Sequence, residues 1–211
     1  MHRFNPEADI KPVWKAYAVP YENKNTVLGA LQYIQEKIDP SLAFRYGCRY
    51  RRCGLCAVEI NGKPAMACYT YAEDGLRVGP LSGLHLIRDL VVDRKSFFEE
   101  LKKYSLYLEP SDGHNARGTP VMEPEQGARL RSCLECLSCI SRCPNRSSGE
   151  GFGVPLIYVR LAQLHFDPRD RKDRLAQAKL LGIDRCRNCN KCFCPNGIAI
   201  IKDAIKPLLG G

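Results

Sequence analysis

Twelve cysteines in three groups of four constrain this 211-residue chain more than any other feature. The first group has the spacing C-x4-C-x2-C-x11-C and consists of Cys48, Cys53, Cys56 and Cys68. The second has the spacing C-x2-C-x2-C-x3-C-P and consists of Cys133, Cys136, Cys139 and Cys143, followed by Pro144. The third repeats that rhythm with its last gap shortened to one residue, and consists of Cys186, Cys189, Cys192 and Cys194, followed by Pro195. Such regular thiol spacing indicates loops that wrap around metal.

The spacings predict iron–sulfur clusters. The first group has the plant-type [2Fe–2S] spacing, and the second has the spacing of a bacterial ferredoxin motif. In two-cluster ferredoxins the fourth cysteine of each motif ligates the other cluster. This crossing predicts a [4Fe–4S] cluster on one set of four thiolates and a distal cluster on another: Cys133, Cys136, Cys139 and Cys194 for the first, and Cys143, Cys186, Cys189 and Cys192 for the second.

The third group leaves two ligand questions open. Its shortened gap means that either Cys192 or Cys194 is displaced from the usual position. Cys189 either packs as a small apolar side chain or completes a distal [4Fe–4S] cluster, and without it the cluster is [3Fe–4S]. Its spacing of three residues from both Cys186 and Cys192 favours ligation. Zinc is the alternative for any single C-x2-C pair, so a zinc-binding structural protein is an outside alternative.

Composition and charge narrow the class of protein. The chain is 45% hydrophobic and 26% charged, which is typical of a globular protein. No apolar run approaches the ~18–20 residues of a membrane span, and the start lacks a signal-peptide core, so we expect a cytoplasmic protein. The formal charge of +9 counts thiols as neutral. Three clusters at about −2 each would leave it mildly basic, and we expect no nucleic-acid partner.

Four arginines surround the first group: Arg45, Arg49, Arg51 and Arg52. They either offset the negative charge of a cluster or form a solvated basic loop that faces an acidic partner.

Residues 1–92 alternate between strand and turn signals around one helix. We expect a strand at 13–19, with Trp14 in the core, and a helix capped by Asn25 or Thr26 and ended by Asp39-Pro40. Its apolar face is Val27, Leu31, Ile34 and Ile38. A hairpin is expected at 57–68 across Asn61-Gly62, with further strands between 76 and 92. These elements predict a β-grasp ferredoxin domain of the plant type, in which Gly54 lets the backbone approach the cluster.

Residues 93–211 show helical periodicity. We expect a helix with the face Phe97, Leu101, Tyr104 and Leu108, and then a polar loop at 109–125. Three further helices are expected: one begins at Pro155, one at 174–181 ends at Gly182, and one at 198–208 is broken late by Pro207. The fold class is therefore α+β, with an all-helical domain like a bacterial two-cluster ferredoxin after the first domain. No Gly-rich dinucleotide fingerprint or catalytic residue emerges, so we expect no flavin or NAD on this chain.

Several runs of the chain resemble the iron–sulfur subunit of succinate dehydrogenase and fumarate reductase. They cover nearly the whole chain in the order of that family: LGALQYI at 28–34, IDPSLAFR at 38–45, GCR at 47–49, CGLC at 53–56, NG at 61–62, AC at 67–68, GPL at 79–81, IRDLVVD at 87–93, the motif that starts at Cys133, and RDR at 169–171.

The resemblance implies an electron-transfer subunit that docks on a flavoprotein interconverting succinate and fumarate. Electrons would pass from FAD on that partner to the [2Fe–2S] cluster, then to the [4Fe–4S] cluster and the distal cluster. In the family the distal cluster commonly feeds quinone at a membrane anchor, which would place the chain peripherally on the inner face of the cytoplasmic membrane.

The chain departs from the quinone-linked members of this family at the distal cluster. Those members usually carry a small or apolar residue at the position of Cys189 and a [3Fe–4S] cluster. The segment 145–149 also lacks the bulky aromatics that are often seen at the family's quinone pocket. Two alternatives follow: a related oxidoreductase whose soluble partner is of the thiol or ferredoxin type, and a free-standing ferredoxin-like carrier.

Overall fold

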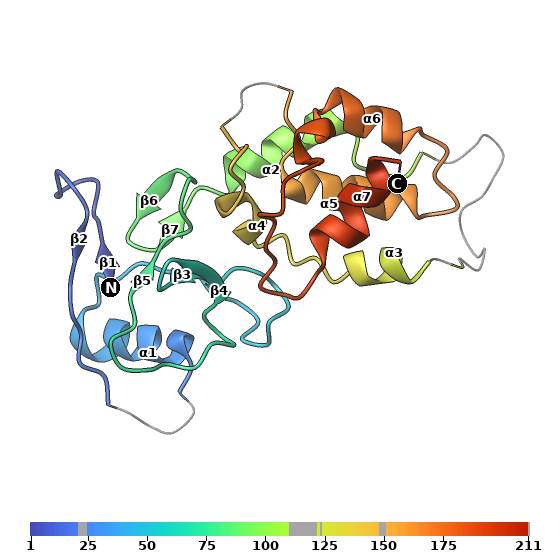
Figure 1. The fold of residues 1–211 in the computed structure, drawn as a ribbon. Coiled ribbons are helices and arrows are strands. Elements are labelled where there is room, and N and C mark those ends of the chain that lie inside the picture. Colours follow the sequence, from blue (N-terminus) through green and yellow to red (C-terminus); the bar gives the residue numbers. More distant parts are fainter. Residues whose placement is uncertain (21–24, 110–121, 123, 148–150, 211) are drawn as a thin grey trace. The chain divides into compact units, whose positions relative to one another are not determined.

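The computed structural model describes residues 1–20, 25–109, 122, 124–147 and 151–210, and combines helices with short strands (Figure 1). The chain divides into two compact units. The first unit comprises Met1–Arg94 and Leu134–Ser141, and the second comprises Lys95–Cys133 and Arg142–Gly211. The first unit therefore includes part of the second cysteine motif.

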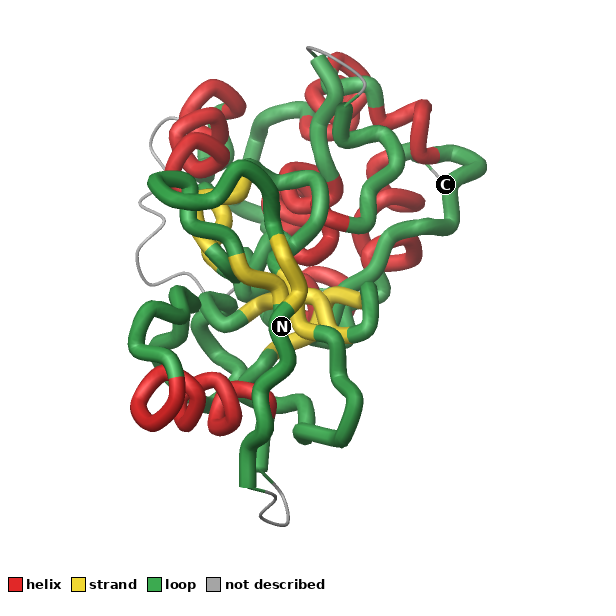
Figure 2. The backbone as a smooth tube through the Cα atoms, turned by 90° about the vertical axis from the view of Figure 1, so that its left-hand side faces the viewer, coloured by secondary structure: helices red, strands yellow, loops and turns green. Residues whose placement is uncertain are grey.

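The described strands of the first unit gather on one side of helix α1 (Figures 1 and 2). Its elements are β1 (His2–Arg3), β2 (Val13–Trp14), α1 (Val27–Tyr33), the π-helix η1 (Ile34–Ile38), β3 (Ala57–Ile60), β4 (Lys63–Met66), β5 (Val78–Gly79), β6 (Leu86–Arg88), β7 (Val91–Val92) and α4 (Ser138–Ser141). The strand order β4-β3-β5 forms an antiparallel sheet, and β1–β2 and β6–β7 form two antiparallel ribbons.

The hairpin of β3 and β4 confirms the sequence prediction. Ile60 pairs with Lys63, so Asn61 and Gly62 alone make the turn. Their φ angles of 50° and 74° lie in the left-handed region that a tight two-residue turn of this type requires. Asn and Gly are the residues that adopt this region at least cost, which is why the turn could be recognised in the sequence.

Helix α1 begins as predicted, and the helical segment ends at Asp39 as predicted, but its last part is not an α-helix. The Thr26 Oγ1 accepts a hydrogen bond from the Gly29 N–H at 3.2 Å and so caps the helix. The last turn is a π-helix, closed by the Asp39 N–H donating to the Ile34 carbonyl at 2.6 Å. The wider turn rotates the later residues away from the buried face. The prediction that Ile38 shares this face is therefore wrong, because its side chain is 45% exposed.

The prediction that Trp14 lies in the core is also wrong. The strand ends at Trp14 itself, and the side chain is 52% exposed at the edge of the unit. Its ring meets the His2 ring edge-on at a centroid distance of 5.6 Å, and the Arg77 guanidinium lies 4.4 Å from its ring centroid. Two polar side chains thus contact an indole that stays half exposed.

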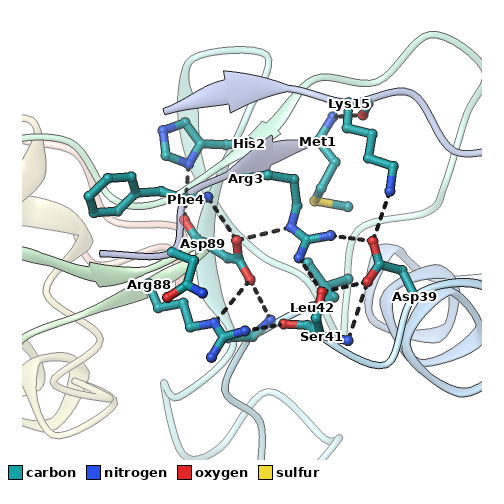
Figure 3. Close-up of polar contacts among 12 residues, drawn as sticks. Met1, His2, Arg3, Phe4, Lys15, Asp39, Ser41, Leu42, Arg88 and Asp89 are labelled. Atoms are coloured by element: carbon teal, nitrogen blue, oxygen red, sulfur yellow. Dashed lines mark hydrogen bonds and ion pairs between the residues drawn. The ribbon is translucent and has the colours of Figure 1, made fainter. Parts of the chain in front are cut away.

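A buried carboxylate ties three segments of the first unit together (Figure 3). The side chain of Asp89 is 1% exposed and accepts hydrogen bonds from the Arg3 Nε at 2.9 Å and from the backbone N–H groups of Phe4 and Ala43, both at 2.8 Å. The β1 strand, the segment after η1 and the turn between β6 and β7 therefore share one anchor.

Asp39 extends the same network (Figure 3). Its carboxylate accepts hydrogen bonds from four side chains: Ser41, Tyr17, Lys15 and Arg3. The hydrogen bond from Ser41, followed by those from Tyr17, Lys15 and Arg3, holds the pKa of Asp39 well below its usual range.

The described helices of the second unit surround α5. They are α2 (Lys95–Leu101), the 3₁₀ helix η2 (Lys102–Tyr104), α3 (Glu125–Leu130), α5 (Pro155–His165), α6 (Arg174–Leu180), the 3₁₀ helix η3 (Ile183–Cys186), the π-helix η4 (Ile201–Ile205) and α7 (Lys206–Leu208). Helix α5 contacts α3, α6, η4 and α7. Its residues Leu156 to Val159, Leu161 and Ala162 are all less than 4% exposed, so this helix is the core of the unit.

Two of the four helix predictions for this unit are confirmed at an end, whereas the last helical segment begins at Ile201 and contains Pro207 in the first turn of α7, so Pro207 does not break it. Pro155 occupies the first turn of α5, and Gly182, with a φ of 71°, follows α6 in the left-handed conformation. The first helix stops at Tyr104, before Ser105 with a φ of 46°, so Leu108 is not helical as expected. The predicted loop at 109–125 lies mostly outside the described residues.

A buried ion pair at the start of α6 is linked by hydrogen bonds to residues 105–109. The side chains of Arg174 and Asp170 are 1% and 2% exposed, and Nε lies 2.5 Å from Oδ2. The guanidinium also donates to the carbonyls of Ser105 and Tyr107 and to the Gln177 side chain, at 2.8–3.0 Å. Within the described residues, no helix combines the length and the apolar character that a membrane span requires.

Candidate iron–sulfur sites

The loop that carries Cys48 and Cys53 turns repeatedly through the left-handed region. Arg49, Arg51 and Gly54 have φ angles of 61°, 54° and 69°. This path aims amide groups at sulfur: the backbone N–H groups of Tyr50 and Arg52 lie 3.4 Å and 3.2 Å from the Cys48 Sγ. Successive amides that point into one concavity favour a negatively charged group such as a thiolate.

The four thiols of the first group lie together in the first unit. The backbone hydrogen bonds from Tyr50 and Arg52 lower the pKa of Cys48 to about 7. Burial raises the pKa of Cys56 to about 12, and the neighbouring thiols Cys68 and Cys53 contribute to the rise. The Cys48 N–H points at the Cys53 Sγ, which lies 3.5 Å from the Cys48 nitrogen. The predicted first set is therefore assembled from the loop and the end of β4.

An iron–sulfur cluster would bind all four of these thiols in their ionised form. Buried neighbouring thiolates repel one another, and a positively charged iron centre relieves that repulsion. No three His, Cys, Asp or Glu side chains among the described residues converge closely enough for one metal ion. The thiolates of a cluster are distributed over several irons, each thiolate binding one iron, and so have no need to converge on one point. The donor set, with its inward amides, fits an iron–sulfur cluster.

The arginines around the first group divide into two kinds. Arg49 and Arg51 lie over the rings of Tyr46 and Tyr69, at 5.4 Å and 4.4 Å from the ring centroids. Arg45 donates to the Val92 carbonyl at 3.0 Å. Stacking and backbone contacts thus occupy three of the four side chains, which holds their charges beside the cysteine loop.

The part of the second motif that belongs to the first unit packs against this loop. A Cβ added to Gly54 would lie 2.9 Å from the Cys136 Cβ and closer still to the Leu134 carbonyl oxygen. Glycine at this position therefore permits the backbone of the first cysteine loop to touch the Cys136 segment, and its role in the approach to a cluster stays a prediction.

Helix α4 is held on the same unit by a polar anchor. The Glu59 Oε1, on β3, accepts hydrogen bonds from the Ser141 hydroxyl at 2.8 Å and from the Ser82 N–H at 2.9 Å. Cys139 lies within this helix, and Cys136 just precedes it with its Sγ 3.3 Å from the Ser138 Oγ. Two thiols of the second predicted set thus have fixed positions in the first unit.

Arg94 is a charged residue of this region that the sequence analysis did not single out. Its Nη2 donates to the Glu135 carbonyl at 2.7 Å, and the guanidinium interacts electrostatically with Cys136, Arg45 and Cys53. Burial lowers the pKa of Arg94 from its usual range. Its only sequence signal is its position after the strand Val91–Val92, and no motif marks it.

The remaining two thiols of the second set lie in the second unit. Cys133 follows α3, and Cys194 belongs to the loop before the last helices. The Asn196 side chain donates to the Ser132 carbonyl at 2.7 Å, which ties the loop after Cys194 to the residue before Cys133. The structure therefore places this set in two pairs, one in each unit.

The distal set is gathered within the second unit. Burial raises the pKa of Cys186 and of Cys192 to about 12, and in both cases the charges of neighbouring thiols add to the rise. Cys192 interacts with Cys186, Cys143 and Cys189, while Cys143 interacts with Cys189. All four predicted thiols thus lie within electrostatic range of one another, and Cys189 is one of them.

Two further residues border the distal set. The Tyr158 hydroxyl donates to the Leu181 carbonyl at 2.6 Å, and its pKa is raised by burial and by Cys186 and Cys143. Arg146 donates to the Cys143 carbonyl at 3.3 Å and favours the thiolate of that residue. A tyrosine and an arginine beside the thiols were not predicted from the sequence, because no spacing rule links them to the cysteines.

Comparison with known proteins identifies the family of this chain. Residues 1–99 match the family model of a 2Fe–2S iron–sulfur cluster binding domain. The chain is 37% identical to a fumarate reductase (CoM/CoB) subunit of Methanothermobacter marburgensis, over 98% of this chain and 42% of that relative. The chain thus spans less than half the length of that curated relative.

Two further comparisons cover most of both chains. The chain is 32% identical to the fumarate reductase iron–sulfur subunit of Escherichia coli O6:H1, over 93% of this chain and 85% of that subunit. A chain of the Mycobacterium smegmatis Sdh1 complex in its apo form superposes with a TM-score of 0.86 at 29% identity, over 98% of this chain and 91% of that chain. This protein therefore belongs to the family of fumarate reductase and succinate dehydrogenase iron–sulfur subunits.

Proposed function

We propose that this chain relays single electrons in a fumarate reductase- or succinate dehydrogenase-type complex, between FAD on a flavoprotein subunit and a terminal electron partner. The observation that carries the proposal is the gathering of Cys143, Cys186, Cys189 and Cys192 in a member of this family. Iron–sulfur clusters supply one-electron chemistry, which divides the two-electron chemistry of a flavin. The chain itself needs no substrate site for this role.

The proposed ligand sets follow the cysteine spacings. Cys48, Cys53, Cys56 and Cys68 hold [2Fe–2S]; Cys133, Cys136, Cys139 and Cys194 hold [4Fe–4S]; and Cys143, Cys186, Cys189 and Cys192 hold a second [4Fe–4S]. The proposed domains are a β-grasp [2Fe–2S] domain at 1–92 and a helical domain at 93–211 that binds the two other clusters. The inward amides at Cys48 support the first set, and the mutual interactions of the distal thiols support the third.

A flavoprotein subunit is the proposed partner at the electron-entry end. The E. coli relative is named an iron–sulfur subunit, and the M. smegmatis neighbour is a chain of a complex, which supports assembly with other subunits. We propose a cytoplasmic location, either free of the membrane or peripheral on its inner face through partner subunits. Twelve cysteines grouped as metal ligands support a reducing compartment.

The terminal partner depends on Cys189. A fourth thiolate completes a [4Fe–4S] cluster, which favours a partner of the thiol or ferredoxin type over a quinone-binding membrane anchor. The name of the M. marburgensis relative, with its CoM/CoB qualifier, supports this second candidate. A quinone anchor is favoured if the distal cluster is [3Fe–4S].

Electron paramagnetic resonance on anaerobically purified protein tests the proposal together with iron quantitation. An oxidised [3Fe–4S] cluster gives a signal, whereas a [4Fe–4S] cluster of this type is silent until it is reduced. We expect silence in the oxidised sample and about ten irons per chain. The Cys189→Ala variant should lose one iron and gain a [3Fe–4S] signal when oxidised.

The control is Asn190→Ala, which changes an exposed neighbour of Cys189 and should keep the wild-type iron count and spectra. A colourless wild-type protein that contains zinc would overturn the electron-transfer function. A strong signal in oxidised wild-type protein would instead overturn the role of Cys189 and restore the quinone-linked alternative.

A further inference from the structure

The guanidinium of Arg94 lies beside ligands of two different proposed clusters. Arg94 interacts electrostatically with Cys53, from the first set, and with Cys136, from the second. All three residues belong to the first unit, so their arrangement is fixed within one compact body. Of the other arginines near the first loop, Arg49 and Arg51 face tyrosine rings, whereas Arg45 interacts electrostatically with Arg94 and donates to the Val92 carbonyl.

One hydrogen bond holds the guanidinium beside the Cys136 segment, and one backbone contact joins that segment to the Cys53 segment. Its Nη2 donates to the carbonyl of Glu135 at 2.7 Å, one residue before Cys136. Gly54, one residue after Cys53, touches the Cys136 segment so closely that an added Cβ would lie 2.9 Å from the Cys136 Cβ. The backbone contact brings the two segments together, and the hydrogen bond places the charge of Arg94 at their junction.

The position of the Arg94 charge determines how strongly it favours reduction of a nearby cluster. Reduction of a cluster adds one negative charge, which a nearby cation stabilises in proportion to the inverse of the distance and of the local dielectric constant. Arg94 is partly buried, so solvent screens its charge less than that of an exposed side chain. A backbone carbonyl is a neutral acceptor, so the hydrogen bond to Glu135 holds the guanidinium and leaves its charge in place.

We propose that the guanidinium of Arg94 stabilises the reduced states of the clusters bound through Cys53 and Cys136, and so raises the reduction potentials of both. The inference rests on the proposed function, because it requires both clusters. In this proposal Arg94 binds neither substrate nor iron. Its charge acts at a distance, by changing the free energy of an electron on each of the two clusters.

Redox titration followed by electron paramagnetic resonance on the iron-loaded chain of residues 1–211 tests this. Arg94→Gln removes the charge and keeps a donor for the Glu135 carbonyl. We expect the equilibrium constant for reduction of each of the two clusters to fall by about tenfold, which is about 59 mV for a one-electron couple. Arg94→Lys keeps the charge and should stay near the wild-type potentials. Lys11→Gln removes an exposed lysine charge and is the matched control.

Iron quantitation separates the possible failures. Wild-type protein without iron would overturn the proposed function itself. Iron-loaded Arg94→Gln protein whose potentials shift no more than those of Lys11→Gln would overturn the role of Arg94 alone. If Arg94→Gln loses iron, Arg94→Lys decides: full iron with wild-type potentials supports a requirement for the charge, and loss of iron in this variant too shows a structural role and overturns the proposal.

Discussion

Replacing Arg174 by methionine should destabilise the second unit more than any surface substitution. The change removes a guanidinium that is 1% exposed and leaves the Asp170 carboxylate, which is 2% exposed, without its counterion. The carboxylate keeps one donor, the Glu109 N–H at 3.0 Å. Breaking a buried pair from one side costs about 3–5 kcal/mol because the remaining charge is buried without compensation.

Two backbone carbonyls add to that cost. The carbonyls of Ser105 and Tyr107 both accept from Arg174, and each loses a charged donor. Because such effects overlap, we expect a total near 4 kcal/mol in the free energy of unfolding. For a chain of this length, about 2–4 °C per kcal/mol gives a fall in Tm of about 10–15 °C.

Calorimetry of the iron-loaded protein under anaerobic conditions measures this fall. Adding Asp170→Asn to Arg174→Met removes the isolated charge and should restore about half of the lost Tm, which a double-mutant cycle would report as coupling. Lys95→Met is the matched control, because it breaks an exposed i,i+4 pair, Lys95–Glu99, with side chains 86% and 56% exposed. A Tm for Arg174→Met as high as that of Lys95→Met would refute the reasoning.

The first unit gives two more predictions. Asp89→Ala should lower the free energy of unfolding by about 3–5 kcal/mol, because Arg3 loses its fully buried partner and keeps only Asp39, and two backbone N–H groups lose their acceptor; denaturant titration of Asp89→Ala against Lys11→Gln checks this. The depressed pKa of Asp39 means that its stabilisation is fully present above about pH 5 and is lost as the pH falls below about 4, towards the folded-state pKa. Asp39→Asn should therefore lower Tm at pH 7 and flatten its decline in acid, and a wild-type Tm at pH 7 for this variant would contradict the prediction.

Local signals in the sequence predicted the elements that local chemistry controls. Thr26 could be recognised as a cap, Asn61-Gly62 as a turn and Pro155 as a first-turn residue, because each acts on its own few neighbours. The cysteine groups belong to the same class, since their spacing is a property of single loops. The thiols of the first and distal sets do lie together in the structure.

Features that depend on contacts between distant parts of the chain could not be predicted from the sequence. Trp14 reads as a core residue from its neighbours, and only the positions of His2 and Arg77 show how it is covered at the edge. The π-turn that exposes Ile38 is closed by the hydrogen bond from the Asp39 N–H to the Ile34 carbonyl. The prediction from the sequence used the regular α-helical period and therefore did not include this wider turn. Arg94 acquires its role only through contact with residues about forty positions later in the chain.

The first unit is closed by residues far along the chain, which has a consequence for synthesis on the ribosome. Glu59 meets its partner Ser141 across 82 positions, and everything from Lys95 to Cys133 emerges between them. A nascent chain that has reached residue 94 therefore presents β3 and the Cys53 loop without the segment that packs on them. A fragment that ends at residue 94 should fold incompletely and bind chaperones, whereas a fragment that extends through Ser141 contains every segment of the first unit and should fold.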